Sequence, residues 1–338
     1  MDTARSRWHC LSQIAFGRSN AHGSRVTEKA NHHQDAGIDK TRMENNACPT
    51  PNSSFELVRP ERQTAAFVFS SPHSGRHYPA EFLAASRLDP ISLRKSEDCF
   101  VDHLFSGMPT FGAPLISALF PRAYLDVNRE PYELDPELVG EPLPAHANTQ
   151  SVRVVGGLGT VARIVADGEE IYAERLSLKS VMERIERLYF PFHSALAGLI
   201  DETEARFGFA VLIDCHSMPS SAAVAGGGIR PDIVIGDRFG ASCDPHLARM
   251  VREAFLRAGY DVQMNRPYAG GYITEHHGKP SRGIHALQIE VNRGLYLDER
   301  RLVPNKGFAG LKADLDSIFQ GIISSAHHRF GGYSAAAE

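Results

Sequence analysis

The chain has 338 residues, enough for one large domain or two ordinary ones, and its content of 42% hydrophobic and 22% charged residues is typical of a folded globular protein. The net charge of −4 is small, and the chain has neither a basic stripe nor a run of 18 apolar residues, so we expect neither a nucleic-acid partner nor a membrane span. The five cysteines are odd in number and form no CxxC pair, which argues against a disulfide framework and favours the cytoplasm.

Residues 1–52 differ in composition from the rest of the chain. They show little apolar periodicity, scattered Arg, Asn, His and Ser, and a proline-rich exit at 48–52. Several acidic residues argue against a transit peptide. We therefore interpret 1–52 as a disordered extension, or as the product of a start codon placed too early, with Met43 as the true start. We expect one folded domain over 53–332 and a short tail at 333–338.

From Phe55 onward, short apolar runs alternate with longer amphipathic ones. In chain order, this pattern first predicts a strand at Ala65–Ser70, helices at Ala80–Ser86 and Ile91–Phe105, and strands at Ala113–Phe120 and Ala123–Val127. A surface loop at Pro131–Gln150 and a long helix at Glu174–Arg206, with a kink at Pro191, follow. The last part of the chain should form strands at Gly208–Asp214, Asp232–Ile235 and His285–Val291 and helices at Asp244–Ala258 and Leu311–Ser325. Nearly continuous apolar strands that alternate with helices indicate a single α/β domain. Its central sheet should be mixed but mostly parallel, with helices on its faces.

Two histidines stand at the ends of predicted strands, where open α/β sheets gather their ligands. His73 follows the first strand in the sequence SPHSG, and His216 follows the strand that ends at Asp214. Asp214 lies two residues before His216, so the strand places both on one face, and Asp214 could orient the imidazole as a buried partner. The alternative for His73 is an ordinary solvated loop histidine.

Two such histidines and one carboxylate would form a three-ligand zinc site with an open position for water. A zinc ion there lowers the pKa of water to about 7 and polarises a scissile carbonyl. There is no His-x-x-Glu motif, because Arg76 stands where the Glu would be. Glu97 and Asp98 are the nearest acidic candidates; we favour Asp98, and the alternative is an ordinary acidic helix start. Cobalt, manganese or nickel would suit the same nitrogen and oxygen ligands.

The segment Pro121–Arg129 places two arginines and an asparagine together. Arg122, Asn128 and Arg129 lie in and just after a predicted strand. Because a guanidinium binds carboxylates through two parallel hydrogen bonds, these residues are candidates for binding an acidic small molecule. Surface salt bridges are the alternative.

A glutamate interrupts the apolar strand near the end of the chain. Glu290 lies between Ile289 and Val291. A buried carboxylate is costly unless it is paired, so Glu290 should face a site. Beside an activated water it would act as a general base. The alternative is a buried ion pair with Arg293 or another arginine.

Taken together, these residues resemble the N-formylglutamate amidohydrolases, distant relatives of zinc carboxypeptidases and aspartoacylases. The resemblance covers about Ser70 to Phe330. It rests on SPHSG within Ser70–Gly75, RAYLDVNRE at Arg122–Glu130, GLGTVARIVADGEEIY at Gly157–Tyr172, DCHSM at Asp214–Met218, RPDIVIGDRFGASC at Arg230–Cys243, and PYAGGYIT and HALQIEVNRGLY toward the end.

The resemblance implies a zinc-carboxypeptidase-like fold and the hydrolysis of N-formyl-L-glutamate to formate and L-glutamate, the last step of one route of histidine degradation. The roles it implies are metal ligation by His73 and His216, proton transfer by Glu290, stabilisation of the oxyanion by Arg122, and binding of a substrate carboxylate by Asn128 and Arg129. Two alternatives stay open: a hydrolase of another N-acyl amino acid or small peptide, and a non-catalytic module that binds an acidic metabolite.

Overall fold

The computed structural model of the chain describes residues 53–165, 168–221 and 230–330. The expected extension at 1–52 and the tail at 333–338 lie outside the described residues. All described residues belong to one compact unit, Cys48–Glu338. No helix of this unit, as far as it is described, has the length and apolar character needed to cross a membrane.

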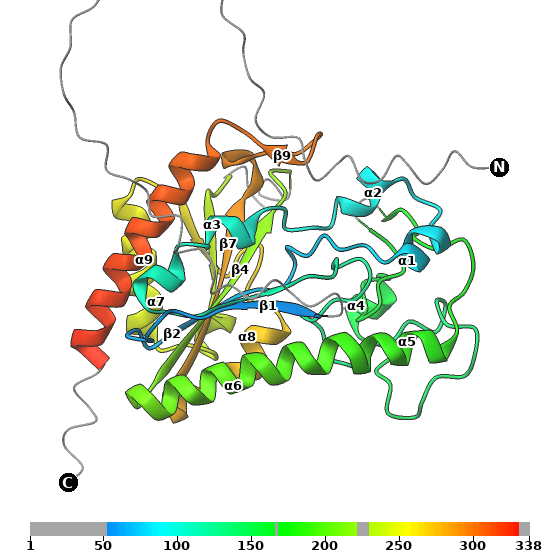
Figure 1. Ribbon diagram of the computed structural model, residues 1–338, viewed down its shortest axis with the longest axis horizontal. Helices are drawn as coiled ribbons and strands as arrows, with labels where there is room; N and C mark the ends of the chain where they lie inside the picture. The colour runs from blue at the N-terminus through cyan, green and yellow to red at the C-terminus, as the bar shows by residue number, and fades with distance from the viewer. Residues whose placement is uncertain (1–52, 166–167, 222–229, 331–338) are drawn as a thin grey trace, which may run out of the picture. The chain divides into compact units, whose positions relative to one another are not determined.

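A seven-stranded sheet forms the centre of the unit (Figure 1). Its strands are β1 (Phe55–Val58), β2 (Phe67–Ser71), β3 (Leu115–Ala118), β4 (Ala210–Met218), β5 (Ile233–Gly236), β6 (Val262–Met264) and β7 (Ile284–Asn292), in the order β1-β3-β2-β4-β7-β5-β6. Four pairings are parallel, β2 with β3, β2 with β4, β4 with β7 and β5 with β6. The pairings of β1 with β3 and of β5 with β7 are antiparallel. The predicted mixed, mostly parallel sheet is therefore confirmed.

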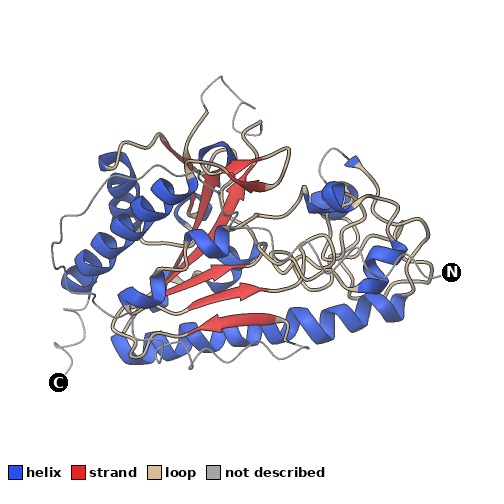
Figure 2. Ribbon diagram, turned by 45° about the horizontal axis from the view of Figure 1, so that its top comes forward, coloured by secondary structure: helices blue, strands red, loops and turns tan. Residues whose placement is uncertain are grey.

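Helices and loops of varied length connect the strands. The helices are α1 (Ala80–Ala85), α2 (Pro90–Arg94), α3 (Val101–Leu104), α4 (Val152–Val155), α5 (Leu178–Arg184), α6 (Phe190–Phe207), α7 (Pro245–Arg257), α8 (Tyr272–His277) and α9 (Phe308–Phe330). A small two-stranded sheet pairs β8 (Leu297–Asp298) with β9 (Val303–Pro304). Figure 2 shows the strands between helices on either side and a broad region of loops beside the sheet.

Alternating residues of the central strands pack into two separate cores. On one face, the odd-numbered residues Val211 and Ile213 of β4 join a core with α7 and α9. On the other face, Ala210 and Leu212 join a core with α6 and α8. This alternation follows from the pleat of a strand, which sends successive side chains to opposite faces. The even-numbered residues near the end of β4 and β7 therefore face the side of α6 and α8.

Two predicted elements near the site described below are wrong, and the predicted surface loop Pro131–Gln150 buries Leu134, Leu138 and Val139 in the core. The expected helix Ile91–Phe105 is broken into α2 and α3, because the chain leaves the helix after Arg94 and the backbone N–H of Asp98 bonds to the carbonyl of His73 instead. The expected strand Ala123–Val127 is a buried loop. Its alternating apolar residues do enter the core, but its backbone bonds to a turn at Pro121 and to Thr160 rather than to a strand.

The long helix differs from the prediction in a way that Pro191 explains. It begins at Leu178, where the side chain of Ser177 caps it, and contains a π-helical turn at Ile185–Tyr189. Pro191 lies two residues after this turn and cannot donate a backbone hydrogen bond, so the preceding turn widens.

Candidate metal centre

Three parallel strands bring the predicted site residues to one edge of the sheet. His73 follows β2, while His216 lies inside β4, which continues beyond its predicted end at Asp214 to Met218. Glu290 lies inside β7, directly opposite His216 in the parallel register of the two strands. The sheet thus places one histidine and the glutamate side by side on the same face, and brings the second histidine to the same edge.

The loop after β2 is shaped by close backbone packing. A Cβ on Gly75 would lie 2.0 Å from the carbonyl oxygen of Phe120, so only glycine fits there. The hydroxyl groups of Ser71 and Ser74 are hydrogen-bonded to each other, and Ser74 Oγ accepts the backbone N–H of Asp102. These contacts hold His73 in a buried position with 1% of its surface exposed, which contradicts the alternative of a solvated loop histidine.

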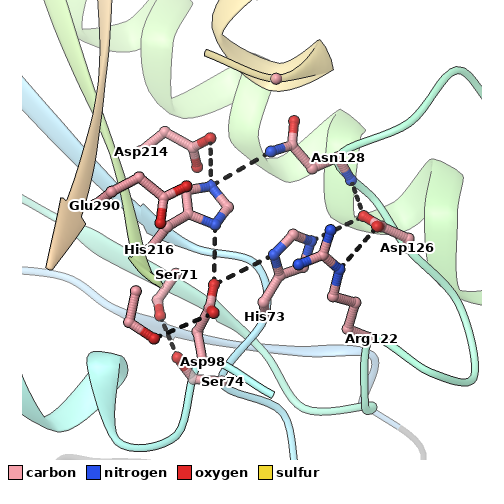
Figure 3. Close-up of polar contacts among 12 residues, drawn as sticks. Ser71, His73, Ser74, Asp98, Arg122, Asp126, Asn128, Asp214, His216 and Glu290 are labelled. Atoms are coloured by element: carbon pink, nitrogen blue, oxygen red, sulfur yellow. Dashed lines mark hydrogen bonds and ion pairs between the residues drawn. The ribbon is translucent and has the colours of Figure 1, made fainter. Parts of the chain in front are cut away.

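His73, Asp98 and His216 form a buried group that could hold a metal ion (Figure 3). Their ligand atoms all lie within 4.8 Å of one another. Asp98 Oδ2 lies 3.3 Å from His73 Nδ1 and 3.0 Å from His216 Nδ1. Two ligands of a tetrahedral zinc ion, each about 2.0–2.1 Å from it, are separated by roughly 3.3–3.5 Å, so the spacing fits such an ion after small shifts.

The hydrogen bonds on the far sides of the two imidazoles support this interpretation. His73 Nε2 lies 2.8 Å from Asp126 Oδ1, and His216 Nε2 lies 2.8 Å from Asp214 Oδ2. A neutral histidine that donates its Nε2 proton to a carboxylate presents a lone pair at Nδ1. Both Nδ1 lone pairs then face the carboxylate oxygen of Asp98, and His73 Nδ1 is buried without a hydrogen-bond partner. Three acceptors aimed at one point suit a cation between them.

The structure separates the two acidic candidates for the third ligand. Glu97 accepts hydrogen bonds from Arg94 and Tyr78, away from the histidines. Asp98 points between the two imidazoles and is 1% exposed. The geometry therefore favours Asp98, as the sequence analysis did.

Glu290 is buried on the same face as His216, and it is not paired with Arg293. Gln288 Nε2 donates to Glu290 Oε1 at 2.7 Å, and Gln288 Oε1 accepts the backbone N–H of Gly271. Arg293 instead donates to Asp98, so the alternative of a Glu290–Arg293 ion pair is wrong. Burial raises the pKa of Glu290 to about 7.

Asp126 connects the metal group to the arginines. One of its oxygens accepts from His73 and from the backbone N–H of Asn128, and the other accepts from Arg122 Nε at 2.9 Å. Burial opposes ionisation of Asp126, but the guanidinium groups of Arg129 and Arg122 outweigh it and hold its pKa well below its usual range. The bond to Asp126 uses only the Nε of Arg122, and that side chain keeps 28% of its surface exposed.

Asn128 and Arg129 are more enclosed than the sequence analysis expected. Arg129 donates to the carbonyls of Leu158 and Asn128 and lies 3.4 Å from Asp126 Oδ2, so each of its three nitrogens has an acceptor. Asn128 Oδ1 accepts the N–H of Ile273. Its Nδ2 lies 3.4 Å from His216 Nε2, a contact between two donors if His216 donates to Asp214. Arg129 can bind a substrate carboxylate only by giving up one of these partners.

Asp126 and Gln288 are site residues that the sequence analysis missed. Asp126 lies between the apolar Leu125 and Val127, and Gln288 lies two residues before Glu290 in an apolar strand. Because a buried polar side chain needs a hydrogen-bond partner, the same argument that singled out Glu290 would have found both.

The fold and the buried His–Asp–His group define an α/β protein with a candidate metal centre, and comparisons with known proteins identify its family. The family model for N-formylglutamate amidohydrolase matches residues 65–297. The N-formylglutamate deformylase of Pseudomonas aeruginosa is 29% identical over 72% of this chain and 87% of its own length. That of Pseudomonas putida is 28% identical over 69% of this chain and 82% of its own length.

Solved structures give the same result. The crystal structure of N-formylglutamate amidohydrolase from Ralstonia eutropha is 34% identical, with a TM-score of 0.78 over 81% of this chain and 99% of that one. A gene product of Agrobacterium tumefaciens, 20% identical with a TM-score of 0.50, shares the fold. The chain belongs to the N-formylglutamate amidohydrolase family.

Proposed function

We propose that this protein is a cytoplasmic, zinc-dependent amidohydrolase that cleaves N-formyl-L-glutamate to formate and L-glutamate. The observation that carries the proposal is the position of Glu290, which lies in register with His216 beside the buried group of His73, Asp98 and His216. The names of the relatives support the substrate, since both Pseudomonas proteins are N-formylglutamate deformylases.

The arginines of the site suit an acidic substrate. We assign Arg122 to the oxyanion that develops on the formyl oxygen, because it is anchored through Nε and partly exposed. Asn128 and Arg129 would bind a substrate carboxylate, with Arg129 exchanging one internal acceptor for it.

Glu290 would transfer the proton. A divalent cation held by His73, Asp98 and His216 would supply an activated water and polarise the formyl carbonyl. A carboxylate with a pKa of about 7 takes up and releases a proton near neutral pH, which suits a general base. Glu290 would accept the proton of the attacking water and return it to the departing amine of glutamate. Gln288 would keep its carboxylate aimed at the site through the 2.7 Å hydrogen bond.

The substitution Glu290→Gln tests the proposal. It removes the proton acceptor and leaves the three ligands, so formate release should fall by at least about 10²-fold while the bound metal stays equimolar. Asp135→Asn is a matched control, because Asp135 is also buried (2% exposed, against 6% for Glu290) but pairs with Arg163 and with none of the site residues. Full activity of Glu290→Gln, or of the wild type after removal of metal, would refute the mechanism.

Two measurements distinguish the proposed function from its alternatives, a hydrolase of another N-acyl amino acid and a non-catalytic binding module. Release of acetate from N-acetyl-L-glutamate faster than formate from N-formyl-L-glutamate would indicate a different acyl group. Tight calorimetric binding of glutamate without any turnover would indicate a binding module.

A further inference from the structure

Arg293 makes contacts that the proposed reaction does not use. It follows β7 directly, and it is 6% exposed although it carries a full charge. Its Nη2 lies 3.0 Å from Asp98 Oδ1, its Nε lies 3.0 Å from Ser217 Oγ, and its Nη1 lies 3.1 Å from the carbonyl of Lys95. One side chain therefore joins the end of β7, the end of β4 and the loop that carries Asp98.

The two oxygens of Asp98 have different surroundings. Oδ1 accepts from Arg293 Nη2 and from Ser217 Oγ, the latter at 3.2 Å. Oδ2 faces the Nδ1 atoms of His73 and His216. Because two donors occupy Oδ1, only Oδ2 is directed at the point where the histidines converge.

The backbone around Asp98 is held as well. Its N–H bonds to the carbonyl of His73 at 3.0 Å, and two residues later Phe100 has a left-handed φ of 62°. This short segment lies between α2 and α3 and has no regular structure of its own. The side chains of Ser217 in β4 and of Arg293, directly after β7, therefore fix the orientation of the Asp98 carboxylate.

We propose that Arg293, with Ser217, is a positioning residue that makes Asp98 a single-oxygen metal ligand. A carboxylate that is free to rotate can bind a cation through both oxygens, which adds a ligand and closes a position that a catalytic site keeps open. With Oδ1 held by Arg293 and Ser217, the protein supplies three ligand atoms and leaves room for water and substrate. This inference rests on the proposed metal-dependent function.

The charge of Arg293 and its positioning of Asp98 have opposite expected effects on metal affinity, which makes the inference testable. Arg293 is a cation close to a site for a divalent cation, so its removal should strengthen metal binding if charge were its only contribution. If it positions Asp98, its removal should weaken binding, by about 10–100-fold as for other residues that orient metal ligands.

Zinc affinity is measured on the full chain by competition with a chromophoric chelator, for Arg293→Met, Arg293→Lys and Ser217→Ala. We expect both Arg293 variants to bind zinc about 10–100-fold more weakly than the wild type. Lys keeps the charge but cannot bridge three acceptors, so it should not restore affinity. Ser217→Ala removes one donor to Oδ1 and should show a smaller loss.

The visible spectrum of the cobalt-loaded protein reports the coordination directly. The wild type should show the intense bands of a four- or five-coordinate ion, and the Arg293 variants the weak bands of a six-coordinate one. Arg184→Met is the matched control, since Arg184 is also 6% exposed but bonds to the carbonyl of Tyr124 and the hydroxyl of Tyr172 and to none of the three metal ligands. It should lower stability and leave zinc affinity and the cobalt spectrum unchanged.

The outcomes separate the inference from the function on which it rests. If the wild type binds no metal, the proposed function fails. If the wild type binds zinc, and Arg293→Met and Arg293→Lys bind it as tightly with an unchanged cobalt spectrum, only the inference is overturned. Should Arg293→Met not fold, Arg293→Lys and Ser217→Ala decide the question.

Discussion

Asp126 connects the candidate metal ligand His73 to the two arginines of the site, although the sequence analysis did not select it. It orients His73 through one oxygen and holds Arg122 and Arg129 through the other. A carboxylate in this place couples the ligand sphere to the residues that would bind the substrate. Replacing Asp126 should therefore affect both the metal affinity and the arginines that would bind the substrate.

Asp126→Asn should weaken zinc binding by about 10–100-fold, because an amide accepts more weakly from His73 and presents a donor to Arg122. It should also lower the free energy of unfolding by on the order of 3 kcal/mol, since it leaves the buried Arg129 without its counter-charge. Zinc competition and urea unfolding measure the two effects.

Asp135→Asn is the control for this substitution. Asp135 is equally buried and pairs with Arg163 at 2.8 Å, but Arg163 is 23% exposed and can be hydrated. Its loss should cost less than about 1 kcal/mol and leave zinc affinity unchanged. Equal effects of the two variants would contradict the role of Asp126.

At the scale of elements, α8 is docked against the site through its first residues. The N–H of Gly271 bonds to Gln288, and the N–H of Ile273 bonds to Asn128. A Cβ on Gly271 would lie 2.3 Å from Asn128 Nδ2. The backbone of Gly271 is extended (φ −91°), so alanine is strained there by contact and not by conformation.

Gly271→Ala should destabilise the protein by about 1–3 kcal/mol and lower kcat/KM, because it displaces Asn128 from the site. Zinc affinity should change little, since Asn128 is not one of the three ligands. Gly198→Ala is the control: Gly198 lies inside α6 with no atom within 4 Å of its Cβ position, so alanine should stabilise by about 0.5–1 kcal/mol. Thermal unfolding compares them, and a neutral Gly271→Ala would contradict the close docking of α8.

The sequence predicted most of the sheet because its central strands are long apolar runs. It failed where tertiary contacts override local preference. The segment around Asp98 has a helical composition, but its hydrogen bond to His73 and its contact with Arg293 draw it out of a helix. The strands β1 and β6 are short and were not predicted, since only pairing with a neighbour defines them.

The same limit applies to the site. Strand ends identified His73 and His216, because the carboxyl edge of a parallel sheet gathers ligands, and the cost of a buried charge identified Glu290. The partners of these residues come from distant parts of the chain. No spacing rule connects Arg293 to Asp98 or His73 to Asp126, so these contacts appear only in the folded protein.

At the scale of the whole molecule, buried histidines make stability depend on pH. Burial lowers the pKa of His193 to about 4 and that of His277 to about 3, and their rings stack 5.8 Å apart between α6 and α8. The histidine pKa values of the unfolded chain are near 6.5, so between about pH 6.5 and pH 4 the unfolded chain binds protons at these histidines that the folded protein does not bind. Stability is therefore full above pH 6.5 and falls as the pH drops toward 4.

His193 alone should cost about 2 kcal/mol of unfolding free energy between pH 7.5 and pH 5. His193→Gln, whose amide can still donate to the carbonyl of Val127, should flatten this dependence. His103→Gln changes a histidine that is 55% exposed and should not. Urea titrations at several pH values measure the slope, and an unchanged slope in His193→Gln would contradict the assignment.

The pairing of β4 with β7 has a consequence for engineering this protein. His216 and Glu290 are adjacent because β4 and β7 are hydrogen-bonded to each other in a fixed register. The distance between the proposed metal ligand and the proposed base is therefore set by the spacing of the two strands. Inserting one residue upstream in β7 would turn Glu290 toward α7 and α9, into the opposite core. Loops at the rim can be exchanged to suit new acyl groups, whereas these two strands must be kept residue for residue.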